Sequence, residues 1–148
     1  MKPENIAKKI TTELAGVAPK NTWGETSFFY NPGLKLPNGV YFCTIKEKDG
    51  ANDKSSKLSR AGVYRLSIGV PKEIFEDLFG IKPPRPAKGC IINTGHDFSK
   101  INELTPHPIY GWMSWVSILS PTDKVFQKIY PLIEAAHQNA ITKFDKKF

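Results

Sequence analysis

The segment Val63-Tyr-Arg-Leu-Ser-Ile-Gly-Val70 has the clearest strand pattern in this chain. It alternates with period two: Tyr, Leu, Ile and Val lie on one face, and Val63, Arg65, Ser67 and Gly69 lie on the other. Successive side chains of a strand point to opposite faces of its sheet. The stretch therefore predicts a strand whose apolar face is covered and whose other face carries an arginine.

Other strand patterns lie on both sides of this stretch. Residues 26–30 and 39–45 are rich in β-branched and aromatic residues, residues 90–92 are typical of a short edge strand, and residues 112–119 form the last strand pattern. Consecutive strands with short connections favour an antiparallel sheet. We therefore expect an α+β fold with an antiparallel sheet of four to five strands.

Three segments have apolar residues at helical spacing. They are residues 3–14, 71–79 and 122–144. Ser120 is the predicted N-cap of the last helix, because a proline and then an acid follow it, and Pro131 is expected to kink or split that helix. We expect the N-terminal and C-terminal helices to pack side by side on one face of the sheet.

Two connections have weaker patterns. Residues 46–60 are polar, contain the turn signal Asp49-Gly50, and are typical of a mobile loop or wing between two strands. Residues 98–104 weakly favour a short helix. The segment from Lys82 to Lys88 is rich in proline and is expected to be stiff and extended.

Composition limits the class of protein. The chain has 148 residues, 40% of them hydrophobic and 24% charged, and this predicts a single globular domain. No apolar run approaches the roughly 18 residues that a membrane span needs. Cys43 and Cys90 lie in apolar, strand-like segments and are expected to be buried free thiols, which favours a reducing cytoplasm.

Five motifs occur in one order along the chain. They are Trp23-Gly24-Glu25-Thr26, Asp53-Lys-Ser-Ser-Lys-Leu58-Ser-Arg60, Tyr64-Arg-Leu-Ser-Ile-Gly69, Pro106-His107-Pro108-Ile109-Tyr110-Gly111, and Trp115-Val116 followed by Ser120-Pro121. Together they resemble the domain-of-unknown-function family 6194, small bacterial and fungal proteins without an assigned activity. The order of elements is also similar to that of the MmcQ/YjbR-like domains, for which DNA binding has been suggested. This resemblance implies a fold, and it assigns no function.

His107 stands between two prolines that restrict the backbone. A rigid loop of this kind can direct an imidazole into a pocket as an acid, a base or a ligand. The alternative is a histidine that hydrogen-bonds the backbone and fixes a turn, with a cis proline as one form of that turn. Tyr110 and Trp112 follow closely and supply aromatic surface.

Two further groups belong to the predicted site. Glu25 beside Trp23 at the start of a strand could have a raised pKa and transfer protons, or it could pair with a base such as Arg65. Arg65 itself either points to solvent, forms a structural salt bridge, or holds an anion. The hypothetical site therefore joins Trp23, Glu25, Arg65, His107, Tyr110 and Trp112.

The net charge of +7 favours acidic partners. Lys54, Lys57 and Arg60 in the polar loop could contact a phosphate backbone, which predicts weakly specific nucleic-acid binding. His96-Asp97 and the acidic stretch 49–53 lack the spacing of zinc and calcium sites, so no metal and no cofactor are expected.

The preferred interpretation is a binding or accessory domain, monomeric or homodimeric. It would recognise a small anionic ligand, nucleic acid or a protein partner at a concave sheet surface. The alternative is a small enzyme in which Glu25 and His107 act as an acid–base pair and Arg65 as an anion clamp. Chemistry would require those groups to converge on one pocket.

Overall fold

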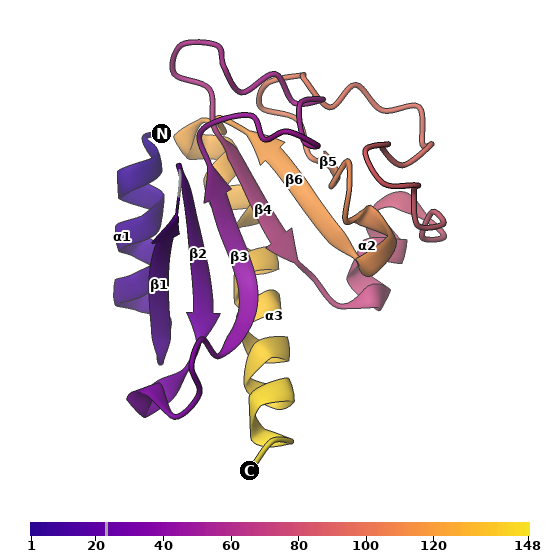
Figure 1. Cartoon of the computed structure of the whole chain (residues 1–148). Coiled ribbons are helices and arrows are strands. Elements are labelled where there is room, and N and C mark those ends of the chain that lie inside the picture. Colours follow the sequence, from indigo (N-terminus) through magenta and orange to yellow (C-terminus); the bar gives the residue numbers. More distant parts are fainter. Residues whose placement is uncertain (23) are drawn as a thin grey trace.

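A computed structural model describes residues 1–22 and 24–148 (Figure 1). The sheet is antiparallel throughout its named strands, with the order β1-β2-β3-β4-β6-β5. The elements in chain order are α1 (Pro3–Glu13), β1 (Val17–Thr22), β2 (Glu25–Tyr30), the 3-10 helix η1 (Pro32–Leu34), β3 (Val40–Lys46), β4 (Arg65–Gly69), α2 (Lys72–Phe79), β5 (Thr105–Pro106), the 3-10 helix η2 (Gly111–Met113), β6 (Trp115–Leu119) and α3 (Asp123–Asp145).

The α+β fold is confirmed, and the sheet is wider than expected. It has six strands in the described part of the chain instead of four to five. The edge strand β1 reads Val-Ala-Pro-Lys-Asn-Thr, which has no period-two alternation and contains a proline, so its sequence gave no strand signal. Residues 90–92 form no strand, residues 98–104 form no helix, and the last strand begins only at Trp115, after η2.

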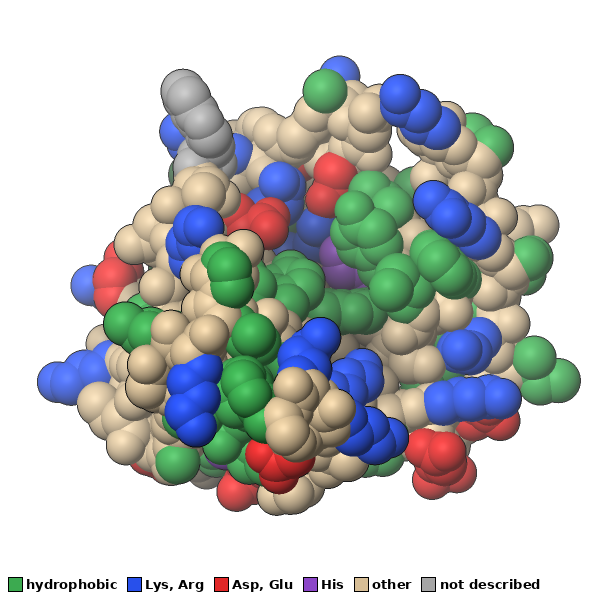
Figure 2. All heavy atoms as spheres, turned by 60° about the horizontal axis from the view of Figure 1, so that its bottom comes forward, with side chains coloured by type: hydrophobic (Ala, Val, Ile, Leu, Met, Phe, Trp, Pro, Cys, Tyr) green, Lys and Arg blue, Asp and Glu red, His purple; other side chains and the backbone are tan. Residues whose placement is uncertain are grey.

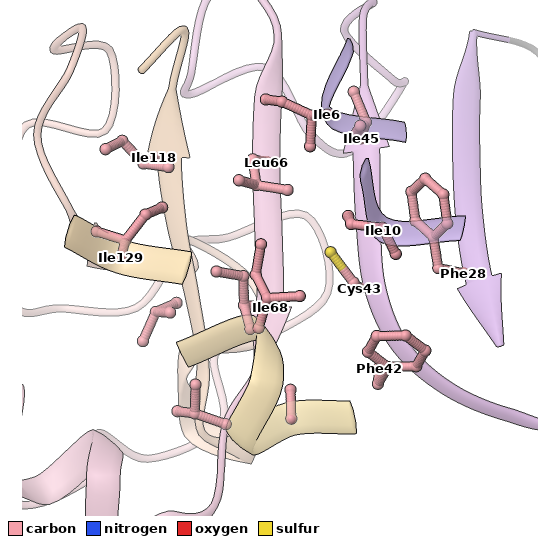
Figure 3. Close-up of a cluster of buried hydrophobic side chains, with 14 of the residues drawn as sticks. Ile6, Ile10, Phe28, Phe42, Cys43, Ile45, Leu66, Ile68, Ile118 and Ile129 are labelled. Atoms are coloured by element: carbon pink, nitrogen blue, oxygen red, sulfur yellow. The ribbon is translucent and has the colours of Figure 1, made fainter. Parts of the chain in front are cut away.

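Both terminal helices cover the same face of the sheet, as expected. Ile6 and Ile10 of α1 and Ile129 of α3 belong to one buried cluster with side chains of β2, β3, β4 and β6. In Figure 3, Ile6 lies near Leu66, Ile10 lies near Phe28, and Ile129 lies near Ile118. The opposite face of the sheet, which carries Arg65 and Ser67, is therefore turned away from both helices.

The start of α3 differs from the expected one. The N-cap is Thr122, whose hydroxyl accepts a hydrogen bond of 3.3 Å from the Val125 N–H. Ser120 instead donates to the Gly62 carbonyl and accepts from the Tyr64 N–H, each at 3.2 Å. Pro131 does not split the helix, which is continuous from Asp123 to Asp145. A Ser-Pro-Thr-Asp sequence offers two capping hydroxyls, and the tertiary contacts of Ser120 decide between them.

A β-bulge in β3 separates the two faces of this strand. Phe28 of β2 lies opposite Cys43, whereas Phe29 lies opposite Tyr41, so Phe42 is an additional residue. Phe42 and Cys43 are both buried in the core under the helices. Because of the bulge, Tyr41 still lies on the face that is turned away from the helices.

The segment between β3 and β4 folds back over the sheet and does not project as a wing. The Asp49 carboxylate accepts hydrogen bonds from the Leu58 N–H at 2.8 Å and from the Ser59 hydroxyl at 3.2 Å. Leu58 is buried in a second, small apolar cluster with Val63 and Leu119. Polar sequence here thus reflects internal hydrogen bonding and not a solvated hairpin.

None of the helices in the described residues is long and apolar enough to span a membrane.

Candidate functional site

A cavity of about 680 Å³ lies on the sheet face that is turned away from α1 and α3. In Figure 2, acidic, basic, hydrophobic and histidine side chains surround a hollow in the surface. Charged, polar and aromatic side chains line the cavity. They include Glu25, Tyr41, Thr44, Lys46, Asp53, Arg65, Arg85, Lys88, Cys90, His107, Tyr110, Trp112 and Trp115. Its volume falls within the roughly 300–1,000 Å³ of small-molecule sites.

Strand register organises this face into three rows that cross the sheet. The first is a charged row: Glu25 lies directly opposite Lys46, and Lys46 lies directly opposite Arg65. Like charges directly opposite each other destabilise a sheet, so the neighbouring Lys46 and Arg65 require acidic partners. Glu25 and Asp53 supply them.

The second row consists of hydroxyl side chains. Ser27, Thr44, Ser67, Ser117 and Thr105 are successive cross-strand partners through β2, β3, β4, β6 and β5. The two central serines share a hydrogen bond of 2.9 Å. Of this row, Thr44 lines the cavity, whereas Ser67, Ser117 and Thr105 are buried beside it.

The third row is aromatic. Phe29 lies opposite Tyr41, and their ring centroids are 5.4 Å apart. Trp115 lies opposite Gly69 and extends across it to Tyr41, with the two ring centroids 4.8 Å apart. Arg65 and Gly69 are four positions apart in β4, so the charged and aromatic rows are about 13 Å apart at the backbone.

Arg65 is held by a buried ion pair with Asp53. Its Nη1 and Nη2 donate to the two carboxylate oxygens at 2.8 and 2.5 Å, and Nη1 also donates to the Ser56 hydroxyl at 3.1 Å. Burial acts to raise the pKa of Asp53, but the hydrogen bonds and the charge of Arg65 outweigh burial, and the pKa is lowered. Of the alternatives for Arg65, the structure thus shows the salt bridge.

Glu25 pairs with Lys46 and not with Arg65. The distance from Lys46 Nζ to Glu25 Oε2 is 3.3 Å, and both side chains are partly buried. The sequence offered Arg65 as a partner because it is the conspicuous base in a strand. Strand register places Lys46 between Glu25 and Arg65, so Lys46 is the nearer cation and forms the ion pair with Glu25.

His107 is buried at the pocket and fixes a turn. Its Nδ1 accepts hydrogen bonds from the backbone N–H groups of Ile109 and Tyr110, at 3.0 and 3.1 Å. Burial lowers the pKa of His107 well below its usual value, and the positive charge of Arg65 acts in the same direction. The imidazole is therefore neutral, with its proton on Nε2. The peptide bonds of the described residues, including those to Pro106 and Pro108, are trans.

Tyr110 and Trp112 form part of the outer wall. The Tyr110 ring lies 5.0 Å from the His107 ring, between centroids. The guanidinium carbon of Arg85 lies 5.0 Å from the centre of the Trp112 ring, a cation–π distance. This contact joins the proline-rich segment to η2, so that residues 85–90 form one side of the cavity.

Five of the six predicted site residues thus line one cavity: Glu25, Arg65, His107, Tyr110 and Trp112. The sixth, Trp23, lies outside the described residues. Their role in binding stays a prediction.

The basic residues of the polar loop differ from one another. Lys54 and Lys57 are exposed. Arg60 donates three hydrogen bonds to backbone carbonyls, those of Lys57, Ser56 and Ser99, at 2.8 to 3.1 Å. Arg60 therefore connects two loops. Of the three residues predicted to contact nucleic acid, Lys54 and Lys57 are exposed, and within the described residues their side chains make no such loop contact.

Sequence reasoning missed Lys46, Asp53 and Tyr41 as members of the site. Lys46 directly follows a predicted strand, Tyr41 lies within that strand, and Asp53 begins one of the five motifs. These positions do not show that the three side chains meet at one cavity, because that depends on strand register. Arg85 and Lys88 belong to the proline-rich segment, which nothing in the sequence connects to the site.

Cys43 is buried as expected, but Cys90 is exposed at the pocket, because residues 90–92 do not enter the sheet. Among the described residues no group of three or more metal-ligating side chains is close enough to hold an ion.

Comparison with known proteins gives one match. Neither a curated protein nor a solved structure matches the chain. The further similarity to MmcQ/YjbR-like domains has no support from these comparisons and stays a prediction. The model of a family of unknown function, DUF6194, matches residues 1–148, and the chain therefore belongs to the DUF6194 family.

Proposed function

We propose that this domain binds a small acid that carries a flat ring, in the cavity between the charged and aromatic rows. The observation that carries the proposal is that basic side chains and a stacked pair of aromatic rings line one cavity. Apolar walls with a few fixed polar groups are typical of small-molecule sites. A ring would pack against Tyr41 and Trp115, with its acidic group directed toward the basic residues.

The charge of the lining supports an anionic ligand. Lys46, Arg65, Arg85 and Lys88 face the cavity together with only two carboxylates, those of Glu25 and Asp53. The inner cations are paired with these two acids. Within the described residues, Arg85 and Lys88 have no ion-pair partner. The acid of the ligand would therefore meet Arg85 and Lys88 at the rim of the cavity.

The test is calorimetric titration with benzoate and phenyl phosphate, and with uncharged benzamide as the matched ligand. We expect both acids to bind more tightly than benzamide. The double variant Arg85→Ala/Lys88→Ala should lower the affinity for the acids by about tenfold, because it removes the unpaired charges. The control is Lys124→Ala/Lys128→Ala, which removes the same charge from exposed positions of α3. Equal losses in both double variants, or benzamide binding as tightly as benzoate, would contradict the proposal.

The alternative, an enzyme with Glu25 and His107 as an acid–base pair, requires a His107 nitrogen that is free to accept a proton from a substrate. The Nδ1 lone pair of His107 is used by two backbone N–H groups, and Glu25 is paired with Lys46. This geometry favours binding over acid–base chemistry by His107 and Glu25. If a turnover reaction is found, Glu25→Gln should abolish it under the alternative, and turnover that persists in this variant would contradict the acid–base role of Glu25.

We also place the protein in the cytoplasm, as a monomer or homodimer. The cytoplasmic location rests on two cysteines that form no disulfide, of which Cys90 is exposed. Fractionation of cells that express the tagged protein tests the location, and sedimentation tests the oligomeric state.

A further inference from the structure

Two buried polar atoms of the cavity lining have no hydrogen-bond partner among the described residues. They are the Arg65 Nε–H and the Thr44 hydroxyl. Arg65 is 2% exposed and Thr44 is 4% exposed. Both side chains line the cavity. Buried polar groups in proteins are nearly always hydrogen-bonded, so two unpaired groups at one cavity require an explanation.

Neighbouring side chains do not supply the missing partners. Ser67, directly opposite Thr44, is hydrogen-bonded to Ser117. The Tyr41 side chain is near enough to Thr44 for the Thr44 hydroxyl to lower the pKa of Tyr41, but among the described residues no group is within hydrogen-bond geometry of that hydroxyl. Burial raises the pKa of Tyr41 to about 12, with Thr44 acting in the opposite direction, so Tyr41 stays an uncharged phenol. The partner of the two groups is therefore to be sought in a ligand.

The two groups set the chemistry of that partner. Arg65 Nε–H can only donate, and a threonine hydroxyl can donate as well, so an acceptor oxygen suits both groups. The charge of Arg65 is already balanced by Asp53 at hydrogen-bond distance, and the nearby His107 is neutral. The interior of the cavity is therefore polar without net charge, which favours an uncharged oxygen over an anionic one.

We propose that the ligand ring carries a carbonyl oxygen that accepts hydrogen bonds from Arg65 Nε–H and the Thr44 hydroxyl, while its acidic group stays at the rim. This inference rests on the proposed function and narrows it. The ligand class is an acid-substituted heterocycle with a ring carbonyl, in which the acid is a carboxylate or a phosphate. Thr44 is then the residue that distinguishes such rings from plain aromatic acids.

The experiment compares two pairs of probes by calorimetry. Orotate and benzoate are ring carboxylates with and without ring carbonyls, and uridine 5′-monophosphate and phenyl phosphate are the corresponding phosphates. We expect the carbonyl-bearing member of at least one pair to bind about tenfold more tightly, the effect of one well-formed hydrogen bond. The pair that shows this preference identifies the acid as carboxylate or phosphate.

Two variants from the hydroxyl row provide opposite signatures. Thr44→Val keeps the shape and removes an unpaired hydroxyl, so the melting temperature should be unchanged or higher. The carbonyl preference should fall, and only the part that Arg65 Nε–H supplies should remain. Ser67→Ala breaks the hydrogen bond to Ser117, so it should lower the melting temperature and leave the preference intact.

The outcomes separate this inference from the function on which it rests. If benzoate binds as tightly as orotate and phenyl phosphate as tightly as the nucleotide, or if Thr44→Val keeps the full preference, the carbonyl inference is wrong and the binding of ring acids stands. If none of the four probes binds at 10 mM, near the roughly millimolar limit of weak but specific binding, both proposals are wrong.

Discussion

His107 is the residue whose two interpretations the structure separates most clearly. Its Nδ1 accepts from two backbone N–H groups, so His107→Gln leaves both without a matching acceptor. We expect this change to lower the free energy of unfolding by about 1–3 kcal/mol. His107→Asn should cost less, because an asparagine oxygen lies about as far from the backbone as Nδ1 does. Urea unfolding measures both variants, and equal stability of His107→Gln and the natural protein would remove the turn-fixing role.

The same histidine should make stability depend on pH. In the folded protein its pKa lies well below 6.5, so below about pH 6.5 the unfolded chain binds a proton that the folded chain does not. The free energy of unfolding should therefore fall as the pH decreases from about 6.5, by up to about 1.4 kcal/mol per pH unit. The full contribution is present above that pH.

Asp53, whose folded pKa is also lowered, adds a second loss of stability below about pH 4. Unfolding at a series of pH values should show both decreases. In His107→Asn the decrease below pH 6.5 should be absent, and the one near pH 4 should remain. A decrease at pH 6 that persists in this variant would assign it to another group.

At the scale of the elements, the crossing of Trp115 over β4 depends on the absence of a side chain at Gly69. A Cβ there would lie 2.8 Å from two carbon atoms of the indole ring. Gly69→Ala should displace Trp115 from Tyr41 and lower the melting temperature, and Gly69→Val should do so more strongly. Near-ultraviolet circular dichroism reports the displaced ring.

Gly50→Ala is the matched control for this prediction. A Cβ at Gly50 meets its nearest atom, Lys46 Nζ, at 3.5 Å, an ordinary contact with a flexible side chain. The substitution should leave stability within about 0.5 kcal/mol of the natural protein. If Gly69→Ala behaves in the same way, Trp115 is not held by that close approach.

Elements with strong periodicity could be predicted from the sequence, and those defined by pairing could not. The alternation in residues 63–70 predicts the two faces of β4, and it places Arg65 on the less apolar face, where the cavity lies. β1 owes its existence to pairing with β2, because its own residues have no strand pattern. The cap of α3 depended on contacts of Ser120 with residues 56 and 58 positions away in sequence.

The site shows the same division. His107, Tyr110 and Trp112 lie in one short motif and could be grouped by eye. Asp53 and Lys46 belong to the site because they form ion pairs with residues of other elements, Asp53 with Arg65 and Lys46 with Glu25. Period two tells which face a residue is on, but the cross-strand neighbour is set by register, which a single sequence does not display.

At the scale of the whole molecule, the net charge of +7 is the basis for the prediction that the protein binds nucleic acid. If Lys54 and Lys57 contact phosphates, binding to single- or double-stranded nucleic acid should appear at about 50 mM salt and weaken steeply as salt rises. Lys54→Glu/Lys57→Glu should abolish it. Arg60 is left unchanged because its loss would break the loop contact to Ser99.

Lys143→Glu/Lys146→Glu makes the same charge change near the end of the chain and serves as the control. A filter-binding or anisotropy titration decides between the outcomes. No binding of DNA or RNA by the natural protein at low salt, or equal loss in both variants, would remove the nucleic-acid hypothesis.

The bulge in β3 has a consequence for how such a protein can change over generations. Phe42 is the additional residue of the strand, and its side chain belongs to the core, where its ring lies 5.6 Å from that of His137. A replacement at Phe42 alters packing beneath the helices without moving Tyr41 or Thr44 on the other face. Natural variation can therefore adjust the core and the cavity separately along one strand, so that a lineage can acquire a new ligand without a new fold.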